Sequence, residues 1–429
     1  MRKESAPFVF VPFSKKQKQT LNWWVDESPV KDADGIIADG AIRSGKTVCM
    51  SLSFVMWAMA NFNGENFGLC GKTILSFRRN VLGPLKKMLK TRGYVFEDHR
   101  SDNLLTIRRG LVINDFYIFG GKDESSQDLI QGITLAGVFC DEVALMPESF
   151  VNQATARCSV EGSKLWFNCN PEGPHHWFKE LWIDRANERR LLHLHFTMDD
   201  NLSLSETIKN RYKLQYTGVF YERFIRGLWV IAEGVIYDMW DPKKHLVDVA
   251  DEDMLDVFYV SCDYGTQNAT VFLLWQKGVN GTWYCIDEYY YSGREQGRQK
   301  TDAQYVDDLK RFLEGRKPRA VVVDPSAASF IEALRQAGYA VIKADNAVLD
   351  GIRETGVLLN NEKILFSTKC TNTAAEFGSY VWDPKAAARG DDAPVKDHDH
   401  CMDAVRYFVH TIIIGRRARI GDKRKKGFR

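Results

Sequence analysis

The stretch Gly40–Thr47, GAIRSGKT, decides the fold of the first half of this 429-residue chain. It fits the complete P-loop pattern, in which a glycine is followed by four residues and then by Gly-Lys-Ser/Thr. Gly40 and Gly45 allow the tight turn that aims backbone amides at phosphate oxygens. Lys46 would carry a positive charge to the β- and γ-phosphates, and the Thr47 hydroxyl can bind Mg²⁺. The expected nucleotide contacts within this loop are Gly40, Arg43, Ser44, Gly45, Lys46 and Thr47.

The segments on either side of the loop have the secondary structure that the motif requires. Gly35–Asp39 is a short apolar run typical of a buried strand, and residues 48–60 are apolar at helical spacing. A bound phosphate would therefore lie at a helix N-terminus. A glycine-rich turn without a ligand is the simpler alternative. Such a turn does not require a strand before it and a helix after it, so the flanking segments favour the P-loop.

Two acids end a second apolar run. Leu135–Cys140 is typical of a buried strand, and Asp141 and Glu142 follow it directly. In a P-loop NTPase the aspartate at this position holds Mg²⁺, and an adjacent glutamate can polarise the attacking water. Two acids after an apolar run are common by themselves, but downstream of a complete P-loop they indicate a nucleotide triphosphatase.

Four other polar residues of this half are candidates for a functional role, and the residues alone leave simpler alternatives open. Gln17 could read the adenine edge, although a solvated polar turn is the simpler interpretation of the residues alone. Asn170, at the end of a strand-like run before Pro171, could sense the γ-phosphate or form an ordinary Asx turn. Arg43 and Arg157 are both candidates to stabilise charge on the transferred phosphoryl group. The residues do not decide between these two arginines.

Strands that alternate with helices predict a doubly wound α/β sheet with the nucleotide at the carboxyl ends of its strands. Further elements complete the expectation for this half. A strand is expected at 72–79, a helix at 81–91, a hairpin at 104–119, a strand at 165–169 and a helical segment at 202–224.

The second half carries three aspartates beside buried runs. Asp263 and Asp324 each follow a predicted strand, whereas Asp403 and His400 share one face of a predicted helix. This order is the one expected of a ribonuclease H-like fold. Carboxylates brought together in this way can bind two divalent ions about 3.5–4 Å apart. Such a pair of ions activates a water for phosphodiester hydrolysis. A lone aspartate at a strand end is more often a cap, so only the set of three favours a nuclease.

The spacing of the histidines and cysteines does not fit a structural zinc site. His398, His400 and Cys401 lie too close together in the sequence, and no C-x-x-C pair is present. The nine scattered cysteines are typical of reduced thiols in a cytosolic protein. We expect no secretion signal and no membrane segment, because no apolar run reaches about 18 residues.

Charge and composition indicate ordinary globular domains. The chain is 45% hydrophobic and 27% charged with a formal net charge of +2, so any DNA-binding surface must come from local segregation of charge. The segment 416–429 is such a segregated run, either a solvated tail or a phosphate-binding arm.

The motifs GAIRSGKT, VFCDE, NCNP and DHCMDAVRY together resemble the large terminase subunit of tailed bacteriophages and prophages. The resemblance extends from about Gln17 to Val409, and the last motif is the most particular to that family. It implies an ATPase at 1–200, a lid or linker at 201–235, a ribonuclease H-like nuclease at 236–415 and a basic tail at 416–429.

The resemblance also implies roles for individual residues. Gln17 would contact adenine, Asn170 would couple ATP hydrolysis to movement, and Asp141 with Glu142 would form the Walker B pair. The nuclease would bind Mg²⁺ or Mn²⁺. Its expected catalytic residues and metal ligands are Asp263, Asp324, His400 and Asp403.

The implied partners are double-stranded DNA, a small terminase subunit and the portal protein of a procapsid. The implied assembly is a homo-oligomeric ring in the host cytoplasm, docked on the portal during packaging. Two rival functions fit part of the pattern. A helicase or remodelling ATPase would need no second active site, and an integrase or transposase would need no P-loop. A non-enzymatic capsid or scaffold role would leave both sets of acids unexplained.

Overall fold

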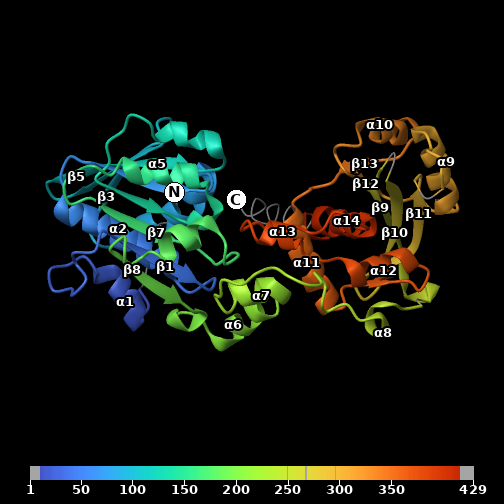
Figure 1. Cartoon of the computed structure of the whole chain (residues 1–429), viewed down its shortest axis with the longest axis horizontal. Coiled ribbons are helices and arrows are strands. Elements are labelled where there is room, and N and C mark those ends of the chain that lie inside the picture. Colours follow the sequence, from blue (N-terminus) through green and yellow to red (C-terminus); the bar gives the residue numbers. More distant parts are fainter. Residues whose placement is uncertain (1–9, 249, 266–267, 295, 416–429) are drawn as a thin grey trace, which may run out of the picture. The chain divides into compact units, whose positions relative to one another are not determined.

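The computed structural model describes residues 10–415 except 249, 266–267 and 295, and it divides the chain into two compact units (Figure 1). The first unit comprises Met1–Lys213, Val219–Ile231 and Ala388–Asp391, and the second comprises the rest. Within the described ranges, no helix has the length and apolar character needed to cross a membrane. The predicted basic tail, 416–429, lies outside the described residues.

The first unit is built on an eight-stranded sheet with the order β3-β4-β5-β2-β6-β7-β1-β8. Neighbouring strands from β5 to β8 are parallel, whereas β3, β4 and β5 form antiparallel pairs at one edge. The bounds are β1 Gly35–Gly40, β2 Asn66–Gly71, β3 Val95–His99, β4 Leu104–Arg109, β5 Val112–Gly120, β6 Gly137–Cys140, β7 Lys164–Asn168 and β8 Leu191–Phe196.

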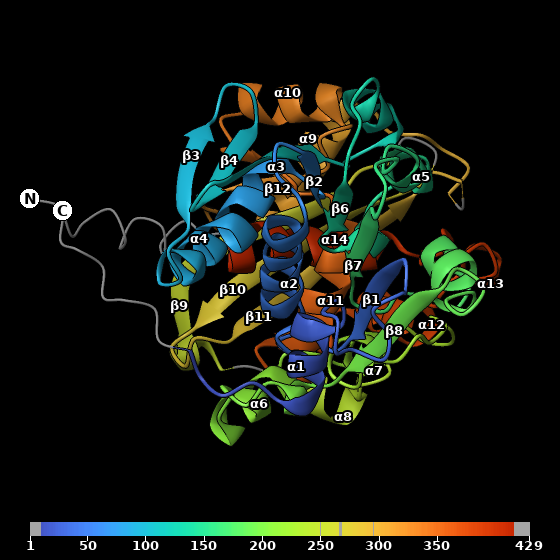
Figure 2. The same cartoon turned by 90° about the vertical axis from the view of Figure 1, so that its left-hand side faces the viewer.

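Helices cover both faces of this sheet. Figure 2 shows α1 (Lys15–Asn22), α2 (Lys46–Asn61) and α4 (Gly83–Lys90) in front of the strands. They bury one apolar core with side chains such as Ile36, while Ile37 points into a second core that includes α5 (Glu148–Ala156). Successive side chains of a strand point to opposite faces, so a continuous apolar strand supplies both cores. The predicted doubly wound sheet is confirmed.

The strand predicted at 72–79 is wrong. The chain is already helical there, in α3 (Ile74–Phe77) and the π-helical turn Arg78–Leu82, and the Thr73 side chain caps α3. The strand is instead β2, just upstream. A Cβ at Gly71 would lie 2.8 Å from the Phe77 ring, so the helix packs where only glycine fits. Glycines lower strand propensity and hid this strand from the sequence pattern.

The helical segment expected at 202–224 is broken. It forms α6 (Glu206–Lys213) and α7 (Gly218–Phe224), separated by a turn at residues 214–217. The amide of Ile42 in the P-loop donates to the carbonyl of Phe224 at 2.9 Å. The end of α7 is therefore attached to the loop that carries the P-loop motif.

The second unit has a six-stranded mixed sheet with the order β13-β12-β9-β10-β11-β14. Strands β9, β10 and β11 are antiparallel, while β12 pairs in parallel with both β9 and β13. This is the predicted ribonuclease H-like arrangement. The bounds are β9 Met254–Asp263, β10 Ala269–Gly278, β11 Trp283–Ser292, β12 Val321–Val323, β13 Val341–Lys343 and β14 Ile364–Phe366.

Helices also cover both faces of the second sheet. On one face α9 (Asp302–Leu313) and α10 (Ala328–Gln336) share a core with β9, β10 and β12. On the other face Phe408 of α14 (His400–Phe408) stacks on Trp275 of β10 with ring centroids 4.3 Å apart. The other α-helices described in this unit are α8 Pro242–His245, α11 Val348–Asn360, α12 Thr371–Ser379 and α13 Pro384–Ala387.

Candidate active sites

The P-loop turns between the end of β1 and the start of α2 through backbone conformations that require glycine. Gly40 has φ +120°, and a Cβ there would lie 2.0 Å from the Phe196 carbonyl oxygen. Gly45 has φ +88° and occupies the N-cap position of α2. The first amides of α2 have no partner within the helix, so they are available to an anion in the loop.

Lys46 is buried and lies within the curve of the loop. Its ammonium donates to the carbonyl oxygens of Gly40 at 2.9 Å and Ala41 at 2.7 Å, and to Ser44 Oγ at 3.3 Å. It also donates to Asn170 Oδ1 at 3.2 Å. Burial lowers the pKa of Lys46 to about 8. The lysine is thus held by neutral oxygens, which an anionic phosphate can replace as a stronger partner.

The two predicted motifs meet at Thr47 and Asp141. The Thr47 hydroxyl donates to Asp141 Oδ1 at 3.0 Å. Burial, and then the charge of Glu142, raise the pKa of Asp141 to about 6. Glu142 is exposed at the strand end and has a left-handed backbone with φ +59°. A buried carboxylate beside a threonine hydroxyl is a pair of oxygen donors suited to Mg²⁺.

Asn168, at the end of β7, joins these residues and was not predicted as a site residue. Its Nδ2 donates to Thr47 Oγ1 at 3.1 Å, and its Oδ1 accepts from the Glu142 amide at 2.9 Å. The sequence does carry a signal for Asn168, because it precedes Asn170 by two residues in the run Asn168-Cys169-Asn170.

Gln17 contacts the P-loop from α1. Its Oε1 accepts from the Ser14 amide at 3.0 Å, and this bond is part of the capping box at the start of α1. Its Nε2 lies 3.5 Å from the Ser44 carbonyl oxygen of the P-loop. Gln17 is 5% exposed, so the solvated turn suggested by the residues alone is wrong. The side chain lies against the P-loop.

The two candidate arginines lie in different places. Arg43 is in the P-loop with φ +57°, its carbonyl accepts from Asn201 Nδ2 at 2.7 Å, and its guanidinium lies 5.3 Å from the ring centroid of Tyr212. Arg157 follows the end of α5, and its guanidinium faces the side chain of Gln153. Of the two, Arg43 is thus the one that belongs to the loop itself.

A buried carboxylate beneath the P-loop was missed from the sequence. Asp39 is 1% exposed and accepts hydrogen bonds from His193 Nε2 at 2.8 Å, His195 Nδ1 at 3.1 Å and Trp229 Nε1 at 2.7 Å. Burial alone would raise the pKa of Asp39, but the two histidine bonds outweigh it and lower the pKa below its ordinary value. Asp39 thereby joins β1, β8 and the segment after α7.

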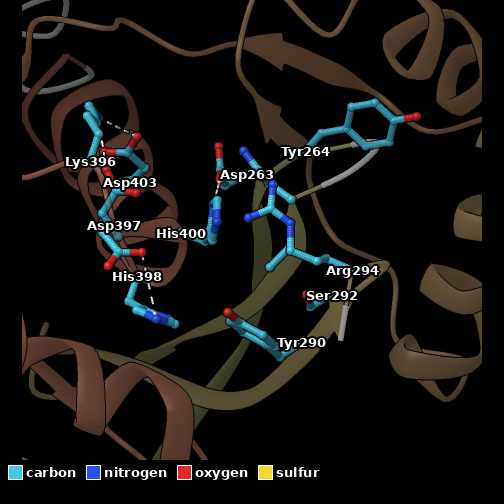
Figure 3. Close-up of a pocket in the computed structure, with 14 residues that line it drawn as sticks. Asp263, Tyr264, Tyr290, Ser292, Arg294, Lys396, Asp397, His398, His400 and Asp403 are labelled. Carbon is cyan, nitrogen blue, oxygen red and sulfur yellow. Dashed lines mark hydrogen bonds and ion pairs between the residues drawn. The ribbon is translucent and has the colours of Figure 1, made fainter. Parts of the chain in front are cut away.

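Three of the four residues predicted for the second site, Asp263, His400 and Asp403, line a cavity of about 540 Å³ in the second unit (Figure 3). Asp263 ends β9, and its Oδ2 accepts from His400 Nδ1 at 2.8 Å. Burial raises the pKa of Asp263, and the hydrogen bond to Asp263 raises the pKa of His400. The cavity is lined by Asp263, Tyr264, Gly265, Asn268, Ala269, Tyr290, Ser292, Arg294, Lys396, Asp397, His398, Asp399, His400 and Asp403.

Asp403 lies between two cations. Its Oδ2 is 3.2 Å from Lys396 Nζ, and its Oδ1 accepts from Arg406 Nη2 at 2.8 Å. The same lysine lies 3.0 Å from Asp399 Oδ2. Figure 3 shows Lys396 pointing at Asp403 on one side of the cavity and Arg294 on another. Neither Lys396 nor Asp399 was assigned a role from the sequence.

Asp324 follows β12, the parallel neighbour of β9, but it does not line the cavity. Its Oδ1 accepts from the Ser326 amide at 2.7 Å, and its Oδ2 accepts from Tyr407 at 2.8 Å and Asn346 at 2.9 Å. Burial would raise the pKa of Asp324, but these bonds, first that to Ser326, lower it. Tyr407 of α14 is the side chain that ties Asp324 to the helix of Asp403.

The predicted metal ligands of the second unit are engaged with other partners. In the part of the chain that the structure describes, no three His, Cys, Asp or Glu side chains are placed to hold a metal ion. Asp263 and His400 form one pair, Asp403 pairs with Lys396, and Asp324 is held by Tyr407. The donor atoms, carboxylate oxygens with one imidazole, are of the kind that Mg²⁺ and Mn²⁺ accept.

Comparison with known sequences finds two matches. The family model described as "Terminase large subunit, T4likevirus-type, N-terminal" matches residues 37–241. A curated protein of Escherichia phage T5, "Terminase, large subunit", is 22% identical over 296 residues. That match covers 65% of this chain and 66% of the relative, so the aligned part is just under two thirds of the relative's length.

Comparison with solved structures finds much closer matches. The large terminase of a thermophilic bacteriophage, in its crystal form 2, is 61% identical with a TM-score of 0.87. The match covers 94% of this chain and all of that one. Structures of the same phage protein in complex with ADP and with ATP-gamma-S, with the same coverage, are 61% and 60% identical with a TM-score of 0.83 each.

Proposed function

This chain belongs to the family of bacteriophage large terminases, and from that premise we propose that it couples ATP hydrolysis to packaging of double-stranded viral DNA. We further propose that a second, metal-dependent site cuts concatemeric DNA. One observation carries the proposal: the two sets of predicted residues gather in different compact units. Lys46, Thr47 and Asp141 belong to the first unit, whereas Asp263, His400 and Asp403 belong to the second.

ATP is the proposed ligand of the first unit. The large terminase of the thermophilic bacteriophage is described in complexes with ADP and ATP-gamma-S, and the lysine of the P-loop here is held by neutral oxygens. Thr47 and Asp141 would hold Mg²⁺, which neutralises charge on the β- and γ-phosphates. Glu142, exposed at the strand end, would orient the attacking water. Gln17 would read the adenine, and Arg43 or Arg157 would stabilise the transferred phosphoryl group.

Asn170 is the proposed link between hydrolysis and movement. Its side-chain oxygen accepts from Lys46 at 3.2 Å. A γ-phosphate would compete with Asn170 for the same ammonium, because anionic oxygens are the stronger acceptors. Asn170 would therefore gain or lose a partner as the γ-phosphate leaves, which is what a sensor of hydrolysis requires.

A two-metal nuclease is the proposed activity of the second unit. Asp263, Asp324, His400 and Asp403 would hold Mg²⁺ or Mn²⁺, which activate water and stabilise the leaving oxygen in phosphodiester hydrolysis. His400 already holds the Asp263 carboxylate through Nδ1, and an imidazole at this position can also carry a proton. Arg294 also lines the cavity, where a DNA phosphate would meet its positive charge.

Partners and location follow from membership of the family. We propose that the chain acts on double-stranded DNA with a small terminase subunit, as a homo-oligomeric ring docked on the procapsid portal in the host cytoplasm. The proposed functional limits are 1–200 for the ATPase, 201–235 for the lid, 236–415 for the nuclease and 416–429 for the tail.

Two variants of the full chain test the proposal. We expect Lys46→Ala to abolish ATP hydrolysis and to leave Mn²⁺-dependent cleavage of plasmid DNA unchanged, whereas Asp263→Asn does the reverse. Equal loss of both activities in a folded variant would contradict two separate sites. Strand separation without cleavage by the wild-type chain would support a helicase instead, and strand joining would support an integrase.

A further inference from the structure

Helix α14 supplies two of the proposed nuclease residues from its first turn, His400 and Asp403. The first amides of a helix have no partner within it, so this turn frays unless an acceptor is supplied. Asp399 occupies the N-cap position, but its side chain makes no capping bond. Its carboxylate is instead paired with Lys396 at 3.0 Å. The acceptor for the start of α14 must come from elsewhere.

Glu376 of α12 is that acceptor. Its Oε2 accepts from the amides of Cys401 at 2.7 Å and Met402 at 3.1 Å, the residues that directly follow His400. Glu376 is 5% exposed, so its bonds are shielded from water. A buried carboxyl oxygen that accepts two backbone amides satisfies two of the donors that a helix N-terminus leaves without a partner, and this holds the turn in place.

The helix that carries Glu376 is held in the same way. Glu288, in the middle of β11, accepts through Oε1 from the amide of Asn372 at 2.6 Å. Its Oε2 accepts from the amide of Thr373 at 3.0 Å and from the Thr373 hydroxyl at 2.8 Å. The start of α12 is thus tied to the sheet, and Glu376 of α12 ties the start of α14.

We propose that Glu376 is a positioning residue of the nuclease centre, which fixes the first turn of α14 and thereby the directions of His400 and Asp403. The inference rests on the proposed nuclease function and adds a residue that touches neither DNA nor metal. His400 is one residue from the first amide that Glu376 accepts. Loosening of this turn therefore moves the imidazole away from Asp263 before it affects the rest of the helix.

A purely structural cap would behave differently from a positioning residue. Asp241 provides the matched control, since its carboxylate accepts from the Lys243 amide at 3.0 Å and caps α8 of the same unit. Loss of either cap is expected to destabilise the fold, but only loss of the Glu376 cap is expected to weaken metal binding.

The test is Mn²⁺ binding to the full chain, without nucleotide or DNA, followed by the spectroscopic signal of free Mn²⁺. We expect Glu376→Ala to weaken binding about 10- to 100-fold, as for other residues that hold metal ligands in place. Glu376→Gln keeps an acceptor oxygen and should recover most of the affinity, and Asp241→Ala should leave it unchanged. Unchanged affinity in Glu376→Ala, or an equal loss in Asp241→Ala, overturns the inference.

If the alanine variant does not fold, Glu376→Asp takes its place. The shorter side chain keeps the carboxyl group but withdraws it from the two amides, so Mn²⁺ binding should again weaken. Wild-type affinity in that folded variant overturns the inference.

Failure of the nuclease proposal itself has a separate signature. Asp263→Asn would then bind Mn²⁺ as well as the wild type, and the positioning role of Glu376 would fall with that proposal. If Asp263→Asn loses Mn²⁺ binding and cleavage while Glu376→Ala keeps both, the nuclease stands and only the role of Glu376 is wrong.

Discussion

Thr47 and Asp141 are joined by a 3.0 Å hydrogen bond from the threonine hydroxyl to Asp141 Oδ1. The bond connects the first turn of α2 to the end of β6, so the two motifs of the nucleotide site already meet in the structure. Asn168 donates to the same hydroxyl at 3.1 Å and accepts from the Glu142 amide at 2.9 Å. One buried amide therefore orients residues from both motifs.

The first prediction concerns this amide. Asn168→Ala should lower the rate of ATP hydrolysis about 10- to 100-fold, because residues that hold metal ligands in place typically have effects of that size. The measurement is steady-state phosphate release with saturating Mg²⁺ and ATP. Asn61→Ala is the control, since the Asn61 side chain bonds the Trp57 carbonyl oxygen within α2. A rate within about twofold of wild type in folded Asn168→Ala would show that Asn168 does not support the site.

The second prediction concerns the stability supplied by Asp39. Asp39→Asn replaces an acceptor of three hydrogen bonds by an amide whose NH₂ group faces donors. The free energy of unfolding should fall by roughly 1–3 kcal/mol at pH 7, the range for a buried group left unsatisfied. Denaturant unfolding at several pH values is the measurement.

The pH dependence of this difference has a defined sign. The folded pKa of Asp39 lies below its ordinary value of 3.8, so the carboxylate contributes stability above that value. The contribution is lost as the pH falls through the lower, folded pKa. The gap between wild type and Asp39→Asn should therefore be constant near neutral pH and shrink below about pH 4. A gap that grows on acidification would contradict this account.

The local motifs of the two sites could be read from the sequence because each is short and chemically specific. Gly40–Thr47 lies in one loop, and its glycines, lysine and threonine occupy the geometry that the pattern implies. Asp263 and His400 are 137 residues apart in the sequence. The sequence still predicts that they meet, because Asp263 ends a recognisable strand and His400 begins a recognisable helix. Their side chains are 2.8 Å apart in the structure.

Other features depend on partners that no local pattern reveals. His193 and His195 alternate with leucines in β8, but their partner Asp39 lies about 150 residues away along the chain. Strand β2 was missed because Gly68 and Gly71 are needed for close packing, which sequence propensity counts against a strand. The ion pairs of Lys396 could not be predicted for the same reason, because they form only once residues 396–403 have folded.

The third prediction concerns Tyr407, whose hydroxyl donates to Asp324 Oδ2 at 2.8 Å. Tyr407→Phe should change the free energy of unfolding by only about 1 kcal/mol, because Asp324 keeps its bonds to Ser326 and Asn346. Mn²⁺-dependent cleavage should fall about 10- to 100-fold, since Asp324 loses its tie to α14. Tyr284→Phe, which loses only a bond from Asn280, is the control. Equal cleavage by both variants would remove Tyr407 from the site.

The fourth prediction concerns Lys396, whose ammonium lies 3.0 Å from Asp399 and 3.2 Å from Asp403. A cation bound by these acids must displace the lysine, which opposes metal binding by the free energy of its ion pairs. The Lys396 side chain is 60% exposed, so a pair of this kind is worth roughly 0.2–1 kcal/mol. Lys396→Gln should therefore bind Mn²⁺ more tightly, by a factor of about 1.4 to 5, as measured by titration without DNA.

The control for this fourth prediction is Lys385→Gln, which removes an exposed lysine of α13 in the same unit and should leave Mn²⁺ affinity unchanged. The two variants carry the same change in net charge, so a difference between them reports the local ion pairs. Weaker Mn²⁺ binding in Lys396→Gln would mean that the lysine holds the two acids in place for the metal. Because like-charged carboxylates repel when no cation lies between them, that result would make Lys396 a support of the site and not its competitor.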